Sequence, residues 1–143
     1  MTRIEEYQQT LASLSDWEPF LLQESGLPGP RGNLELMQAV ANQGTRAWFE
    51  KYQALTPEEA PENTPQVFLV CCAIVGLGRL CAEGDTGSLP RLRLLASDPR
   101  WRVREAVCMA LQRFGRADMA ALLNAMRIWA EGNLWEKRAV AAA

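Results

Sequence analysis

Apolar residues recur along this chain at intervals of three and four positions, the spacing that places them on one face of an α-helix. Ile4, Tyr7 and Leu11 follow this spacing near the start of the chain, and a second clear example extends from Val103 to Phe114. Signals for β-strands do not recur in this way. The pattern therefore predicts an all-α fold.

Residues that begin and end helices divide the chain further. Asn33 is a candidate N-cap, and Thr64 with the proline after it starts a long apolar helix that ends at Gly84. Asp98, also followed by proline, is the expected N-cap of the helix that ends near Gly115. Further helices are expected to start near Trp17, Thr45, Ser88, Asp118 and Asn133, the last with Glu136 in a capping-box pattern.

A shift of 34 residues aligns two stretches of the chain. Cys72 to Leu80 aligns without a gap with Ala106 to Phe114, and the same shift also aligns the helices that follow. A fixed period of this size indicates stacked units, each of which buries its apolar face only against its neighbours. The aligned pairs include Gly76/Ala110, Leu77/Leu111, Arg79/Arg113, Leu89/Leu123, Leu92/Met126, Arg93/Arg127, Trp101/Trp135 and Arg104/Arg138.

The segment from Asp98 to Gly115 resembles the first helix of a HEAT repeat, with Asp-Pro at its start, Val-Arg and alanine at its centre, and Ala-Leu-x-x-x-Gly at its end. The resemblance implies an α-α superhelix, a HEAT-like solenoid of helical hairpins. We expect one domain over residues 1–143. Its parts are divergent N-terminal helices at 1–64, the best-defined repeats at 65–97 and 99–132, and the start of a further or capping unit at 133–143.

Composition narrows the class of function. The chain is 48% hydrophobic and 22% charged, which is ordinary for a globular domain. Its longest uncharged apolar run, Val67 to Gly78, is too short to cross a bilayer, and the N-terminus lacks a signal-peptide pattern. We therefore expect a cytoplasmic protein with no membrane association. Without histidine or a C-x-x-C motif, neither a metal site nor a cofactor is expected, and the cysteines are interpreted as buried thiols.

Charge and arginine suggest where a partner could bind. Residues 1–70 carry a net charge of −6 and residues 71–143 of +4, and thirteen of the fifteen basic residues are arginine. Stacked hairpins place equivalent arginines in rows that could meet phosphates or an acidic protein surface. The competing interpretation is that they pair with nearby acids or are solvated. The candidate binding arginines are Arg91, Arg93 and Arg127 on a concave face of second helices, with Arg100 and Arg102 nearby.

Trp101 and Trp135 begin equivalent helices beside basic residues. In this respect the chain resembles the alkylpurine DNA glycosylases built from HEAT-like repeats, which hold damaged DNA in a basic groove. That resemblance implies nucleic-acid binding as an alternative, although their catalytic segment has no match here and core packing also explains both tryptophans. An enzyme accessory similar to bilin-lyase-like proteins rests on repeat length alone. The first hypothesis is a non-catalytic scaffold that binds a protein partner through the concave face.

Overall fold

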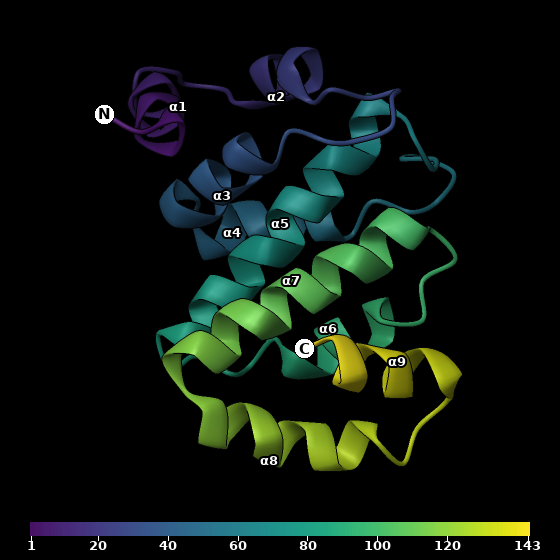
Figure 1. Ribbon diagram of the computed structural model, residues 1–143. Coiled ribbons are helices and arrows are strands. Elements are labelled where there is room, and N and C mark those ends of the chain that lie inside the picture. Colours follow the sequence, from purple (N-terminus) through teal and green to yellow (C-terminus); the bar gives the residue numbers. More distant parts are fainter.

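The computed structural model describes all 143 residues as nine α-helices with no β-strand, which confirms the predicted all-α class. The two longest helices, α5 (Pro65–Ala82) and α7 (Trp101–Ala117), lie side by side through the centre of the molecule (Figure 1). Helices α2, α3 and α4 pack against α5, and α1 covers α3; α6, α8 and α9 pack against α7. The remaining helices are α1 (Arg3–Ala12), α2 (Glu18–Glu24), α3 (Leu34–Gln43), α4 (Arg46–Gln53), α6 (Leu89–Leu95), α8 (Met119–Trp129) and α9 (Leu134–Ala142).

Helix α5 is the core of the fold. Two glycines decide how closely its neighbours approach. A Cβ on Gly78 would lie 2.6 Å from the Cα of Ala110, so the missing side chain lets α5 and α7 pack backbone to backbone. Gly76 leaves room for the ring of Phe49 from α4. Both glycines therefore permit close packing of helices against α5.

By length and composition, α5 is also the one helix apolar enough to cross a membrane, and 78% of it is buried inside the fold. A helix that is buried in the core of a protein also meets these criteria of length and apolar composition.

Residues related by the shift of 34 occupy similar environments in the two best-defined helix pairs. Leu77 of α5 and Leu111 of α7 are both buried, and so are Leu92 of α6 and Met126 of α8. All four belong to one continuous core. The pairs α5–α6 and α7–α8 therefore bury equivalent positions, as the repeat predicts.

Most of the predicted helix starts are confirmed by their caps. The side chains of Asn33, Asp118 and Asn133 each accept a hydrogen bond from a backbone N–H in the first turn of α3, α8 and α9. The prediction for Asp98 was wrong, because the N-cap position of α7 is held by Arg100. Asp98 instead accepts hydrogen bonds from the backbone and the side chain of Arg100, which leaves it outside the helix.

Candidate functional site

The three candidate arginines of the second helices have different surroundings. Arg91 of α6 donates a hydrogen bond from Nε to Gln53 of α4. Arg93, also in α6, forms an ion pair with Glu136 of α9. Arg127 of α8 is exposed and takes part in no ion pair. Of the three, only Arg93 is paired with a carboxylate, and only Arg127 is also without a side-chain hydrogen bond to the protein.

Arg100 is a buried structural residue, with 4% of its surface exposed. Its Nε and Nη2 atoms donate to the two oxygens of Asp98 at 2.8 and 2.9 Å, and Nη1 donates to the carbonyl of Ala60 at 3.1 Å. Burial by itself would raise the pKa of the Asp98 carboxyl, but the hydrogen bonds from Arg100 outweigh it and hold that pKa below its usual value. The pair joins the start of α7 to the loop before α5.

Arg102 links the same end of α7 to two loops. Its Nη2 atom donates to the carbonyl of Gly29 at 2.8 Å and to the side chain of Asn63 at 3.1 Å. Its guanidinium also lies 4.4 Å from the ring centroid of Trp101. These contacts position Trp101, whose indole remains 48% exposed.

One of the predicted arginine rows is directed at the protein itself. Arg79 of α5 and Arg113 of α7 both donate to Asn42, Arg79 to its backbone carbonyl at 2.6 Å and Arg113 to its side chain. Arg79 also donates to the carbonyl of Gly44 at 3.1 Å. These carbonyls lie at the C-terminal end of α3, where unpaired oxygens and the helix dipole favour a cation. This row therefore stabilises the end of a helix.

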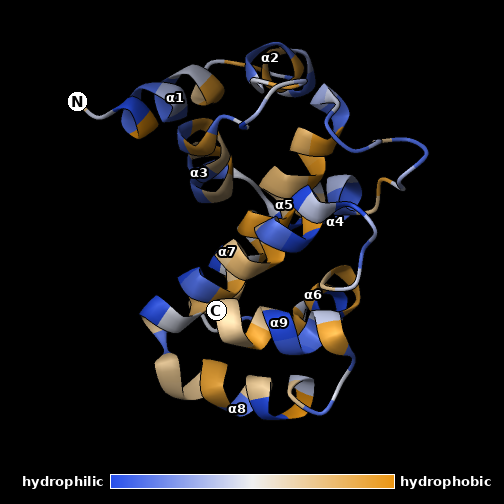
Figure 2. Ribbon diagram, turned by 45° about the vertical axis from the view of Figure 1, so that its right-hand side comes forward, coloured by the Kyte–Doolittle hydropathy of each residue, from blue (hydrophilic) through white to orange (hydrophobic).

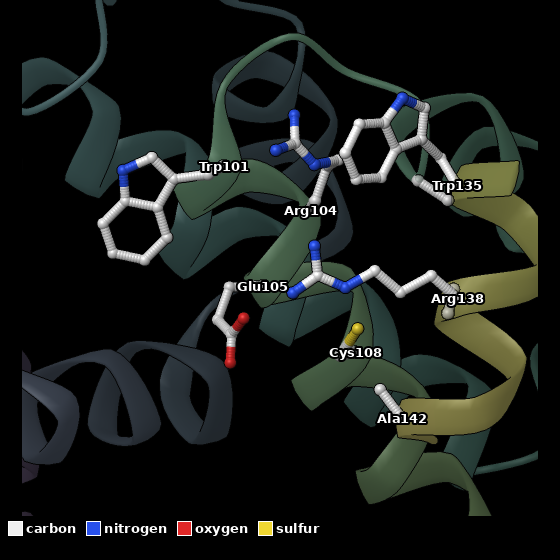
Figure 3. Close-up of a pocket in the computed structure, with 9 residues that line it drawn as sticks. Trp101, Arg104, Glu105, Cys108, Trp135, Arg138 and Ala142 are labelled. Carbon is white, nitrogen blue, oxygen red and sulfur yellow. The ribbon is translucent and has the colours of Figure 1, made fainter.

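A second row meets at Trp135, in a pocket between the start of α7 and α9. The guanidinium of Arg104 lies 4.0 Å from the Trp135 ring centroid and that of Arg138 lies 5.8 Å from it. Figure 3 shows Trp101 and Glu105 projecting from α7, while Arg138 reaches in from α9. The cavity has a volume of about 60 Å³ and opens to solvent. This tryptophan–arginine pocket is lined by Trp101, Arg104, Glu105, Cys108, Trp135 and Arg138, with three alanines.

Two polar groups of this pocket, Arg104 and Cys108, have defined surroundings. Arg104 donates from Nη1 to the carbonyls of Asp98 and Pro99 at 2.7 and 3.0 Å, which fixes its orientation. Burial raises the pKa of the Cys108 thiol, so the reactive thiolate is disfavoured. No group of three or more histidine, cysteine, aspartate or glutamate side chains is placed to hold a metal ion.

Helix α8 provides a second surface. Helical periodicity predicts that Met119, Leu122, Leu123, Met126 and Trp129 lie on one side of this helix. Leu122, Met126 and Trp129 are buried, whereas Met119 and Leu123 are exposed. The reason is tertiary, because the neighbours of α8 are α7 and α9 and no further helix covers its outer side (Figure 1).

The exposed side of α8 continues onto neighbouring helices. Leu94 of α6 and Ile128 of α8 are related by the shift of 34, and they are 68% and 60% exposed. Ile128 also lines a groove between α6 and α8, together with Leu89 and Trp129. Figure 2 shows the mainly hydrophobic colouring of α8. We use the name outer apolar face for the exposed large apolar side chains of α6, α8 and the start of α9, which lie on more than one side of α8: Leu94, Met119, Leu123, Ile128 and Leu134.

No family model, curated protein or solved structure matches this chain. The candidate surfaces therefore rest on the residues themselves. Sequence reasoning identified the two tryptophans of the pocket, which the fold brings together, but it missed Glu105 and the outer apolar face. The sequence contained a signal for that face, because the residues from 118 to 129 are apolar except for Asp118, Asn124 and Arg127.

Proposed function

We propose that this protein is a non-catalytic interaction module of the HEAT-like type, in which the outer apolar face binds a helix of another protein. The observation that carries the proposal is the exposure of Leu94 and Ile128 at equivalent positions of successive units. Large aliphatic side chains that face water together mark interaction surfaces, whereas single exposed ones are common. Here five such residues lie on α6, α8 and α9, which all pack against α7.

The repeat suggests the kind of partner. Second helices of a solenoid pack against the second helix of the next unit, so the outer side of α8 is the position that such a helix would occupy. An amphipathic helix inserts aliphatic residues at intervals of three and four into a groove of this type. The groove between α6 and α8 already has an apolar floor that includes Phe114 and Ala125.

The positive charge of Arg127 indicates a second property of the partner helix. Arg127 lies four residues after Leu123, on the same exposed strip of α8, and it has no acidic partner within the chain. An acidic residue beside the aliphatic ones would pair with it in a partly desolvated interface. The proposed occupant is therefore an amphipathic helix with an acidic flank, supplied by a different protein.

Site-specific photo-crosslinking in living cells tests this proposal. One protein carries a photoreactive amino acid in place of Leu123, and a control carries it in place of Gln9, which is exposed on the distant α1. We expect a discrete adduct with one other protein from position 123 only, lost when Ile128→Asp is added. Equal adducts from both positions, or an adduct with a second copy of this chain, would contradict the proposal.

The identified partner then gives an affinity measurement. Calorimetry with the purified pair should show at least about tenfold weaker binding for Ile128→Asp, because a charge at the centre of an apolar interface is desolvated without a partner. Gln9→Asp adds the same charge to α1 and should leave the affinity unchanged. A loss that is equal for both variants would argue against the outer apolar face.

Nucleic-acid binding is the second candidate, favoured by the arginines that surround Trp135. It is weaker because Arg91, Arg93, Arg100 and Arg102 are held by partners within the protein. Fluorescence anisotropy with a short DNA duplex, measured at about 50 and 200 mM salt, distinguishes nucleic-acid binding from protein binding. Tight binding that falls steeply with salt, and that disappears in the double variant Arg93→Glu and Arg127→Glu, would favour nucleic acid.

A further inference from the structure

The tryptophan–arginine pocket contains charged groups that the fold does not use. Arg138 and Glu105 are exposed at the pocket, and neither takes part in an ion pair. The Nε atom of Arg104 is buried and has no hydrogen-bond partner. The buried Nε atoms of Arg79 and Arg102 also have no partner, whereas Arg100 is fully engaged by carboxylate and carbonyl oxygens. The pocket therefore has an unused capacity to bind polar groups.

The charge of the pocket favours an anion. The guanidinium groups of Arg104 and Arg138 bring two positive charges to the lining, and Glu105 brings one negative charge. The first turns of α7 and α9 also lie here, and the N-terminal ends of helices attract negative groups. A guanidinium without a partner offers a fork of N–H donors that matches a carboxylate or a phosphate.

The aromatic residues favour a planar ligand. Trp101 and Trp135 are 48% and 41% exposed, although tryptophan is among the side chains with most to gain from burial. Each already has a guanidinium near its ring, Arg102 for Trp101 and Arg104 for Trp135. A flat ring placed against the free surface of an indole gains stacking that an aliphatic chain cannot. Alanines complete the lining of this small, open pocket, so part of a bound ligand would remain in solvent.

We infer that this pocket binds a small planar aromatic anion. In this arrangement Arg138 pairs with the phosphate or carboxylate group, an indole stacks on the ring, and Glu105 accepts a hydrogen bond from a ring N–H. A nucleotide and an aromatic carboxylic acid share this chemistry, and the experiment separates them. The inference is independent of the outer apolar face, which lies on other residues.

NMR titration of the full chain tests the inference with two probes, guanosine monophosphate and indole-3-acetate, each up to roughly 10 mM so that weak binding is detected. The signals followed are the indole N–H groups of Trp101 and Trp135, assigned with Trp101→Phe and Trp135→Phe. Inorganic phosphate serves as the control for a bare anion. We expect a saturable shift of at least one of these signals with one probe or with both. The guanosine probe identifies a phosphate-bearing ligand, and the indole probe identifies a carboxylate-bearing one.

Two variants show whether the named groups hold the ligand. Arg138→Gln should weaken binding of the active probe by about tenfold or more, because the charged donor is lost. Arg31→Gln removes an exposed arginine that lies outside the pocket and takes part in no ion pair, so it should leave binding unchanged; both variants should keep the helical circular dichroism of the parent. The inference is overturned if neither probe shifts these signals, if phosphate alone gives the same shift, or if the shift survives Arg138→Gln.

Discussion

Trp129 is buried in the core, but the other four tryptophans have opposite surroundings in the two halves of the molecule. In the first half, Trp17 and Trp48 lie with ring centroids 5.7 Å apart, and Trp48 lies 4.4 Å from Tyr52, so aromatic rings pack on one another. In the second half, Trp101 and Trp135 face guanidinium groups and solvent. The same residue type thus closes one end of the fold and leaves the other open to a partner.

Exposed apolar residues follow the same division. Between residues 1 and 64 the large exposed hydrophobics are Met1 and Leu34, whereas the other seven lie between Leu94 and Trp135. Stacked repeats need a polar terminal unit to stay soluble, and the acidic helices α1 to α4 give the first half such a surface. The open second half is where we place both candidate binding sites.

The largest expected effect is on the free energy of unfolding, and it distinguishes the buried core around Phe49 from the exposed side of α8. Phe49 is fully buried between Gly44 and Gly76, and Phe49→Ala should lower the free energy of unfolding by about 3–5 kcal/mol. Leu123→Ala removes an exposed side chain and should change it by less than about 0.5 kcal/mol. Urea denaturation followed by circular dichroism measures both. Similar losses would show that α8 is covered in solution.

A smaller effect is expected at the junction between the two halves. Gly78→Val inserts a side chain where a Cβ would already lie 2.6 Å from the backbone of α7, so it should cost about 1–3 kcal/mol of stability. Gly87→Val is the control, because Gly87 lies in an exposed turn with room for a side chain. Thermal unfolding of the two variants tests the close packing of α5 on α7. Equal midpoints would mean that the helices lie further apart.

The smallest expected effect is on the pH dependence of stability in acid. Because the pKa of Asp98 is lower in the folded protein than its ordinary value of about 3.9, its stabilisation is complete above that pH and is lost as the pH falls through the folded value. Asp98→Asn should therefore flatten the pH dependence of stability below about pH 4 and lower stability at neutral pH, where Arg100 loses its partner. Urea titrations at several pH values test this, and an unchanged slope would argue against the ion pair.

Sequence reasoning located part of the candidate sites for identifiable reasons. The shift of 34 paired Trp101 with Trp135 and Arg104 with Arg138, and the fold places all four in the lining of one pocket. The exposure of Leu123 was missed because helical periodicity groups apolar residues on a face without indicating whether a neighbour covers it.

The amino-acid sequence alone determined the helical class, most of the helix starts and the equivalence of the two helix pairs, because spacing, capping and periodicity are local properties of the chain. Tertiary structure decided which arginines are free and which apolar residues face water. Arg100 is buried and Arg127 is exposed, although both have the same side chain. Their difference depends on residues distant in sequence, such as Ala60 for Arg100, and only the packed fold brings these together.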